Sequence, residues 1–303
     1  EDLSRGLGDV YKRQNESNVS TTKLTLIKIE DIEMREAVIV SAARTPIGKA
    51  YRGAFNNLES PSMASVAVKA AVDRSGIDPK EVDDCIMGAA IQQGTQGFNL
   101  GRQVAMASGL PVSVAGMTID RQCSSGLMTI ATGAKHIIND NAPITIAGGC
   151  ESISLVQNEH MNSHRIGDPL TIKNAPMIHM PMLDTAETVA KRYNISREAQ
   201  DEYAVASQDR TADAQVRGAF DDEIVPVTAI KMIMNKETGE VTKEEVTLTK
   251  DEGNRPGTTI ENLANLKPVR NDGTITAGNA SQLSDGAAAV VMMEGKLAEQ
   301  RNI

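Results

Sequence analysis

The sequence is poor in aromatic residues, which make up 2% of its 303 residues, and it has no tryptophan. Proteins that bind single-stranded nucleic acids stack the bases on aromatic side chains, so this composition argues against such a partner. The net charge of −9 disfavours nucleic acids and anionic membrane surfaces as well. A phosphorylated small molecule is not excluded, because a few local basic residues can bind one.

Cysteine is also scarce, and long apolar runs are missing. Cys85, Cys123 and Cys150 form no CxxC pair and show no metal-ligand spacing with the four histidines. They are too few for a disulfide framework, which favours a reducing, cytoplasmic compartment. No stretch approaches the roughly 20 apolar residues of a membrane-spanning helix. Because metal-ligand spacing is missing, the sequence calls for no metal. It calls for no permanently bound cofactor either.

From residue 35 onward, segments typical of strands alternate with segments typical of helices. Strand-like runs lie within residues 36–48, 82–94, 142–152 and 274–295, and helix-like runs lie within residues 60–79, 99–111 and 120–138. This alternation predicts an α/β fold in which a mostly parallel or mixed sheet lies between helices. The run at 36–48 is interpreted as a buried strand with its exit loop.

The composition changes three times along the chain, which suggests domain boundaries. Residues 1–34 are polar, and we interpret them as a disordered leader or a translation artefact. Residues 35–151 form the expected amino-terminal α/β domain. Residues 152–280, with long loops, charge-rich helices and a strand pair around the polar turn 235–240, predict an inserted α+β loop domain. Residues 281–303 then return to the first domain with a final strand.

Cys123 stands at the start of a segment with no charge between Arg121 and Lys135. Apolar residues fall at helical spacing after it and small residues fill the gaps, which predicts a central, closely packed helix; the apolar positions are Leu127, Ile130, Ala134, Ile137 and Ile138. A thiol at a helix N-terminus is stabilised as the thiolate by the helix dipole. Alternatively, Cys123 is only a small buried hydrophobic residue, as free cysteines often are. The flanking Asp-Arg-Gln and Ser-Ser-Gly favour a nucleophile in a tight turn.

Residues 120–137 resemble the nucleophile segment of thiolases, the acyltransferases that make or cleave 3-ketoacyl-CoA. Four further segments are similar to thiolases in order and spacing, at residues 36–55, 195–215, 251–268 and 276–290. The resemblance covers essentially residues 35–303. It implies a layered thiolase fold in which the loop domain binds CoA.

The resemblance also implies roles for single residues. Cys123 would be the nucleophile that carries the acyl group as a thioester. Arg255 would face the adenine and phosphate end of CoA. Ala277 and Ser281 would line the pantetheine tunnel, with Met182 near its thiol end. The substrates would be CoA thioesters, and no bound cofactor is implied.

In thiolases, the catalytic acid and base come from Asn-Glu-Ala-Phe, Gly-His-Pro and second-cysteine motifs of the carboxyl-terminal half, and none of these occurs here. We therefore interpret the chain as an amino-terminal half truncated before the second half, and we expect poor turnover by the chain alone. The resemblance also implies a homodimer or homotetramer, with residues 91–103 near the interface.

The resemblance favours thiolytic cleavage of 3-ketoacyl-CoA to acetyl-CoA and a shortened acyl-CoA, as in fatty-acid β-oxidation. A biosynthetic acetoacetyl-CoA thiolase and a non-catalytic CoA-binding fragment remain alternatives. A condensing enzyme of the ketoacyl-synthase type is disfavoured by the insertion after residue 152.

Overall fold

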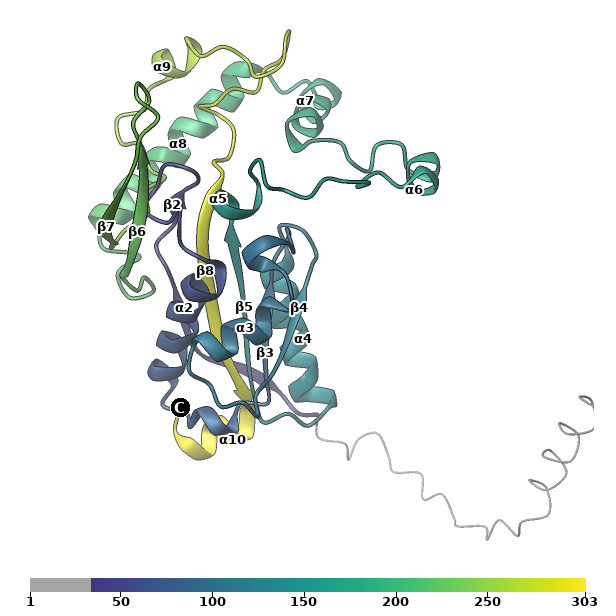
Figure 1. The fold of residues 1–303 in the computed structure, drawn as a ribbon, viewed down its shortest axis with the longest axis vertical. Helices are drawn as coiled ribbons and strands as arrows, with labels where there is room; N and C mark the ends of the chain where they lie inside the picture. The colour runs from purple at the N-terminus through teal and green to yellow at the C-terminus, as the bar shows by residue number, and fades with distance from the viewer. Residues whose placement is uncertain (1–33) are drawn as a thin grey trace, which may run out of the picture. The chain divides into compact units, whose positions relative to one another are not determined.

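In the computed structural model, which describes residues 34–303, a six-stranded sheet runs through the centre of the fold (Figure 1). The strand order is β1-β8-β5-β3-β4, with β2 paired to β8. The strands are β1 (Ala37–Arg44), β2 (Gly48–Lys49), β3 (Asp84–Gly88), β4 (Ala115–Ile119), β5 (Ile144–Ser152) and β8 (Ser284–Glu294). β3 is parallel to β4 and β5, whereas β8 is antiparallel to β1 and β5. The sheet is thus mixed. Of the predicted leader, residues 1–33 lie outside the described residues.

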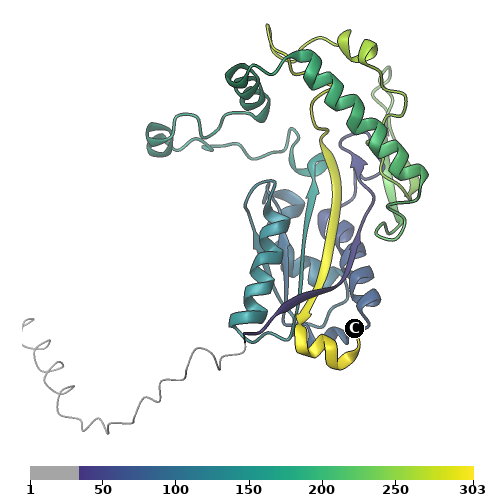
Figure 2. The ribbon, with the colours of Figure 1, turned by 180° about the vertical axis from the view of Figure 1, so that it is seen from behind.

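Helices cover both faces of this sheet. α2 (Ser60–Ser75) and α3 (Leu100–Ala107) pack together on one face, and α4 (Ser125–Asn139) lies on the other, in front of the strands in the rear view of Figure 2. Short 3₁₀ turns at Pro79–Glu81 and Gly94–Gln96 precede β3 and α3, and α10 (Gly295–Arg301) follows β8. The α/β layering predicted from the sequence is confirmed.

The main core lies between the sheet and helices α2 and α3. A smaller cluster lies on the opposite face, because alternate residues of each strand point to opposite faces. Val291 and Met293 of β8 belong to this core, whereas Met292 between them belongs to a small cluster beneath α4 with Ile137 and Ala147. The buried side chains are mostly aliphatic or methionine, as the low aromatic content requires.

α4 packs on the sheet largely through small residues. The predicted apolar face is confirmed at Ile137, which is buried, and at Ile130 and Ala134, which pack beside it, and it is wrong at the two remaining positions. The buried positions of α4 are Ser125, Thr129, Gly133 and Ile137. Leu127 is instead 71% exposed and Ile138 is 38% exposed. A Cβ atom on Gly133 would lie 2.6 Å from the terminal methyl of Met292, so the helix comes close to the strands only because this position lacks a side chain. α4 therefore covers an outer face instead of running through the centre.

The predicted buried strand at 36–48 is also corrected. β1 pairs only with β8 among the described strands and forms one edge of the sheet. Ile39 is 56% exposed on this edge, and the other β1 side chains apart from Ala43 are only partly buried or exposed. An apolar run alone did not reveal that one side of the strand lacks a neighbour.

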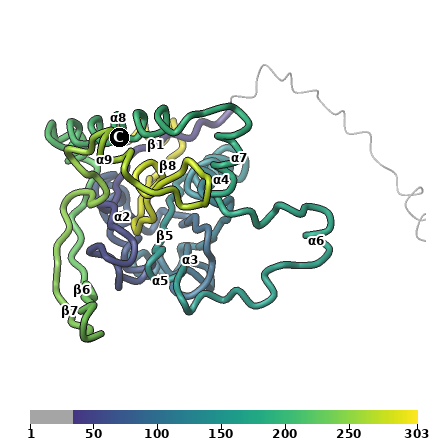
Figure 3. Tube along the Cα trace, turned by 90° about the horizontal axis from the view of Figure 1, so that it is seen from above, coloured from purple at the N-terminus to yellow at the C-terminus, as the bar shows by residue number. Residues whose placement is uncertain are grey.

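The elements between β5 and β8 lie outside the central sheet. They are α5 (Ile153–Val156), α6 (Pro169–Asn174), α7 (Met182–Tyr193), α8 (Arg197–Val216), β6 (Val227–Met234), β7 (Val241–Leu248) and α9 (Ile260–Ala264). β6 and β7 form an antiparallel hairpin around the predicted turn, and Figure 3 shows the α6 segment extending away on the opposite side. A separate domain with boundaries at 152 and 280 stays a prediction. No helix between residues 34 and 303 is long and apolar enough to cross a bilayer.

Candidate active site

Cys123 lies in the tight turn that joins β4 to α4. Ser124 is the N-cap and α4 begins at Ser125, so the thiol precedes the helix by two residues. Gln122 adopts a left-handed backbone conformation with φ of 50°. The Ser125 hydroxyl donates to the Gln122 carbonyl (2.6 Å) and accepts from the Arg121 N–H (2.8 Å). This turn leaves Cys123 exposed beside the first N–H groups of α4.

A pocket of about 430 Å³, which we call the Cys123 pocket, lies at the carboxyl ends of the parallel strands β3 and β5. Gly88, Gly126 and Gly149 line it where the start of α4 touches these strand ends. A Cβ atom on Gly88 would lie 2.6 Å from the backbone carbonyl carbon of Ser125. Open α/β sheets bind ligands at the carboxyl ends of their parallel strands, so Cys123 occupies a usual ligand position.

Glu151, near the end of β5, holds one wall of the Cys123 pocket. Its carboxylate accepts hydrogen bonds from the Ala90 N–H (2.9 Å), the Ile91 N–H (3.3 Å) and the Gln96 amide (2.6 Å). Both Glu151 and Ile91 line the pocket. We did not predict a role for Glu151 from the sequence. A charged residue at the carboxyl end of a glycine-rich buried strand is the signal that could have identified it.

The other two cysteines, Cys85 and Cys150, are buried. Burial raises the pKa of Cys85 to about 12, and burial also raises the pKa of Cys150. Both therefore remain thiols near neutral pH, although Cys150 lines the Cys123 pocket. Cys123 is thus the accessible thiol of the chain.

No histidine lines the Cys123 pocket within residues 34–303, which include all four histidines. His136 lies near the far end of α4, where its Nδ1 is 3.9 Å from the Asp84 carboxylate at the start of β3. In the same part of the chain, no group of three or more His, Cys, Asp or Glu side chains is placed to hold a metal ion. The pocket therefore offers a thiol without an adjacent imidazole.

Two more pockets continue from the Cys123 pocket. The Ser281 pocket, of about 480 Å³, shares Ile47 with it. The Arg255 pocket, of about 270 Å³, shares Gly278 and three other residues with the Ser281 pocket. The shared residues link the three pockets into a series that extends from the thiol to an exposed arginine.

The structure brings together most of the predicted CoA-contact residues. Arg255 and Ala277 line the Arg255 pocket, and Ser281 lines the pocket between it and Cys123. No carboxylate within residues 34–303 forms an ion pair with the Arg255 guanidinium. Met182 is the first residue of α7, is 72% exposed and lines none of the three pockets. Its contact near the thiol stays a prediction.

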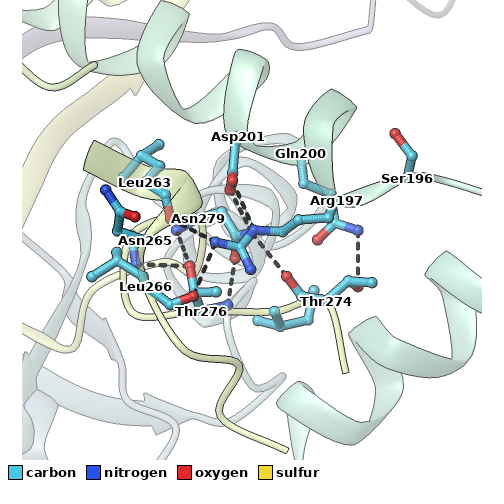
Figure 4. A network of polar contacts seen from close by, with 12 residues as sticks. Ser196, Arg197, Gln200, Asp201, Leu263, Asn265, Leu266, Thr274, Thr276 and Asn279 are labelled. Atoms are coloured by element: carbon cyan, nitrogen blue, oxygen red, sulfur yellow. Dashed lines mark hydrogen bonds and ion pairs between the residues drawn. The ribbon is translucent and has the colours of Figure 1, made fainter. Parts of the chain in front are cut away.

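An ion pair that the sequence did not reveal lies behind the Arg255 pocket (Figure 4). Arg197 Nε is 2.7 Å from Asp201 Oδ2 on α8, and Asp201 is only 2% exposed. From the sequence, this segment is only a charge-rich helix. Opposite charges four residues apart are common on helix surfaces, so their spacing could not indicate burial.

Comparison of this chain with known proteins identifies the family that it resembles. Residues 37–296 match the family model described as "Thiolase, N-terminal domain". The chain is 42% identical over 268 residues to a 3-ketoacyl-CoA thiolase of Bacillus subtilis, covering 88% of this chain and 68% of the relative. It is 40% identical over 280 residues to an acetyl-CoA acetyltransferase of Cupriavidus necator, with the same coverage.

A solved structure agrees with these sequence matches. The crystal structure of the Bacillus anthracis acetyl-CoA acetyltransferase superimposes with a TM-score of 0.76 at 38% identity, covering 89% of this chain and 68% of that chain. The family match over most of the described residues, the two identities and the common fold together show that this chain belongs to the thiolase family of acyltransferases.

Proposed function

We propose that the chain carries acyl groups as a thioester on Cys123 and exchanges them with CoA. The observation that carries the proposal is the exposed thiol at one end of three linked pockets, with Arg255 at the other end, where it forms no ion pair among residues 34–303. CoA is a long molecule with a reactive thiol at one end and phosphates at the other. A series of pockets with this polarity suits it.

The surroundings of Cys123 support the nucleophile role. The thiolate is the reactive form of cysteine, and the partial positive charge of a helix N-terminus favours it. The same N–H groups can stabilise the oxyanion that forms when the thiolate attacks a carbonyl carbon. The turn conformation at Gln122 and the close approach of Gly88 to α4 hold the thiol at this position.

The expected reaction in the degradative direction has two steps. The Cys123 thiolate attacks the 3-keto carbon, the carbon–carbon bond breaks, and the acetyl-CoA carbanion leaves and takes up a proton. The thiol of a second CoA then attacks the acyl-enzyme, which releases the shortened acyl-CoA and regenerates the Cys123 thiol. One thioester replaces another in this second step. Ping-pong kinetics follow because the first product leaves before the second CoA reacts with the acyl-enzyme. We expect the chain to acylate slowly and turn over poorly, because no histidine lines the Cys123 pocket.

Intact-protein mass spectrometry after incubation with acetyl-CoA tests the proposal. We expect wild type to gain one acetyl group, to lose it again when excess CoA is added, and to carry it on the peptide that contains Cys123. Cys123→Ser should gain none. Equal acetylation of wild type and Cys123→Ser would remove Cys123 from the mechanism.

We propose the 3-ketoacyl-CoA thiolase subtype, with fatty-acid β-oxidation as its setting. Its support is the loop residues 180–187 and 251–259, which are similar to degradative thiolases. The biosynthetic alternative is favoured by two of the matched proteins, from Cupriavidus necator and Bacillus anthracis, which are named acetyl-CoA acetyltransferase. Acylation rates of Cys123 with acetyl-CoA and with longer acyl-CoAs distinguish the two. Acylation by acetyl-CoA alone would favour the biosynthetic type.

We also propose that the protein forms a homodimer or homotetramer through residues 91–103. In this segment Phe98 is 100% exposed and has a left-handed backbone with φ of 49°, an unfavourable state for an isolated aromatic residue. Sedimentation of wild type and Phe98→Ser tests this, since the variant should dissociate. A monomeric wild type would exclude it. The cytoplasmic location stays a prediction.

Mass spectrometry and calorimetry together decide the alternative of a CoA-binding chain without acyl transfer. Such a chain would bind CoA in calorimetry but would gain no acetyl group on Cys123. Because binding and acylation are read out separately, the two functions give different results on one preparation.

A further inference from the structure

The buried ion pair between Arg197 and Asp201 contacts both segments that form the walls of the Arg255 pocket. Its Nε–Oδ2 distance is 2.7 Å, and the side chains of Arg197 and Asp201 are 20% and 3% exposed. Burial of two charges is costly unless each makes further hydrogen bonds. Both residues do, and they make them to different segments of the chain (Figure 4).

Arg197 holds the wall formed by α9. One of its terminal nitrogens, Nη2, donates to the Leu263 carbonyl (2.6 Å) and to the Leu266 carbonyl (3.2 Å) at the end of that helix. Leu263 and Leu266 both line the Arg255 pocket. The position of this wall is therefore fixed to α8 through a charged donor.

Asp201 holds the opposite wall, the loop 274–281. Its second oxygen accepts from the Asn279 amide (2.9 Å), and Asn279 in turn donates to the Thr274 carbonyl (3.1 Å) and accepts from the Thr276 N–H (2.7 Å). Asn279 is thus the centre of the loop. Ala277, Gly278 and Ala280 of this loop line the Arg255 pocket.

The two walls touch at Gly278. A Cβ atom at this position would lie 2.5 Å from the Leu263 side chain and 2.6 Å from the Leu266 side chain. α9 and the loop are therefore packed closely at Gly278. Arg197 and Asp201 supply the polar contacts that tie both of them to α8.

We propose that Arg197 and Asp201 are positioning residues for CoA, which fix the two walls of the Arg255 pocket so that it accepts the phosphate-bearing end of the molecule. The inference rests on the proposed function, in which CoA extends from Cys123 to Arg255. Neither residue lines any of the three pockets. Their effect on binding is therefore exerted through α9 and the loop.

Isothermal titration of CoA into wild type, Asp201→Asn and Asp213→Asn tests this. Asp213 is an exposed carboxylate on the same helix and makes no side-chain hydrogen bond or ion pair within residues 34–303, so its variant is the matched control. Asp201→Asn should weaken CoA binding about tenfold, the change that loss of one charged hydrogen bond gives. Asp213→Asn should bind like wild type.

A second readout separates positioning from general damage. Iodoacetamide modifies Cys123 without using the Arg255 pocket, so its rate should be equal in wild type and Asp201→Asn. Equal CoA affinity in the two proteins would overturn the inference, as would an Asp201→Asn variant that loses affinity and alkylation rate together. If Asp201→Asn does not fold, Arg197→Gln replaces it, with the same expected loss and the same contrary results, because Arg197 also lines none of the three pockets. Failure of wild type to bind CoA would instead overturn the proposed function, and this inference with it.

Discussion

At the scale of single residues, three cysteines with identical side chains differ in their surroundings. Cys123 is exposed at a strand-to-helix turn, whereas Cys85 lies within β3 and Cys150 within β5. Desolvation of the thiolate raises the pKa of both buried thiols. Reactivity follows from these positions and not from the residue type.

Selective alkylation follows from this difference. In the native chain at mildly alkaline pH, iodoacetamide should label Cys123 at least about 100-fold faster than Cys85 or Cys150, because the two buried thiols are both inaccessible and protonated. Peptide mass spectrometry after timed quenching measures the three rates. The same chain in denaturant should label all three alike. Comparable native rates would contradict the assignment of Cys123 as the accessible thiol.

Gly88 is the residue at which a side chain would most directly displace the turn that carries Cys123. Gly88→Ala should lower the free energy of unfolding by about 1–3 kcal/mol, because its Cβ would meet the backbone of Ser125 and Gly126, which cannot rotate away. It should also change the alkylation rate of Cys123. Urea titration compares it with Gly253→Ala, where the nearest atoms belong to the flexible side chain of Gln282. Equal stability of the two variants would argue against the close approach.

At the scale of elements, α7 is fixed to the loop 274–281 by a carboxylate. Glu187 accepts from the Thr274 N–H (2.9 Å) and the Ile275 N–H (2.8 Å). Asp184 pairs with Arg270 at 2.6 Å. Asp184 and Glu187 have the spacing of a capping box, but they do not form one, because α7 begins at Met182 and both carboxylates bind a segment more than 80 residues away.

The Glu187 contact predicts acid sensitivity. Desolvation raises the pKa of Glu187, but the hydrogen bonds from Ile275 and Thr274 outweigh it, so the net pKa lies below the ordinary value of 4.5. A lowered folded-state pKa stabilises the fold above the ordinary pKa, and this stabilisation disappears as the pH falls through the folded-state value.

Glu187→Gln should therefore melt about 2–4 °C below wild type at pH 7, the shift that roughly 1 kcal/mol gives in a domain of this size. The gap should close as the pH falls below 4.5. Thermal unfolding from pH 3 to pH 7 measures it, with the exposed Glu202→Gln on α8 as the control. A gap that is constant over this range would show that the Glu187 charge is not responsible.

At the scale of the whole molecule, Arg44 joins the central sheet to the elements between β5 and β8. From the end of β1 its guanidinium donates to Glu223 (2.7 Å) and to both oxygens of Asp251 (2.7 and 3.0 Å). The side chains of Arg44 and Asp251 are 18% and 17% exposed, so the pair is largely shielded from water.

Removal of this cation should be costly. Arg44→Met leaves the Asp251 carboxylate without its charged partner and should lower the free energy of unfolding by about 2–4 kcal/mol. Lys69→Met breaks the exposed Lys69–Asp73 pair and should cost less than about 0.5 kcal/mol. Urea titrations of both variants give the comparison. A similar small loss in both would mean that Arg44 does not hold the two parts together.

Much of the fold follows from the sequence because its signals are local. Pro61 in the first turn and Gly76 at φ of 69° define α2, and the Ser196 cap begins α8, each within a few residues of the end that it determines. The strand-to-helix junction at Cys123 is equally local, and the family resemblance placed Arg255 and Ala277 in what the structure shows to be a single pocket.

The tertiary structure alone decided which surfaces are buried. It placed the small face of α4 against the sheet and turned Leu127 outward. It also buried Asp201, whose partner Asn279 lies 78 residues away. Helical periodicity specifies which residues share a face, but the face that becomes buried depends on segments distant in sequence. The sequence by itself therefore determined the elements and the turn that carries Cys123, whereas packing decided the linked pockets and the groups that hold them in place.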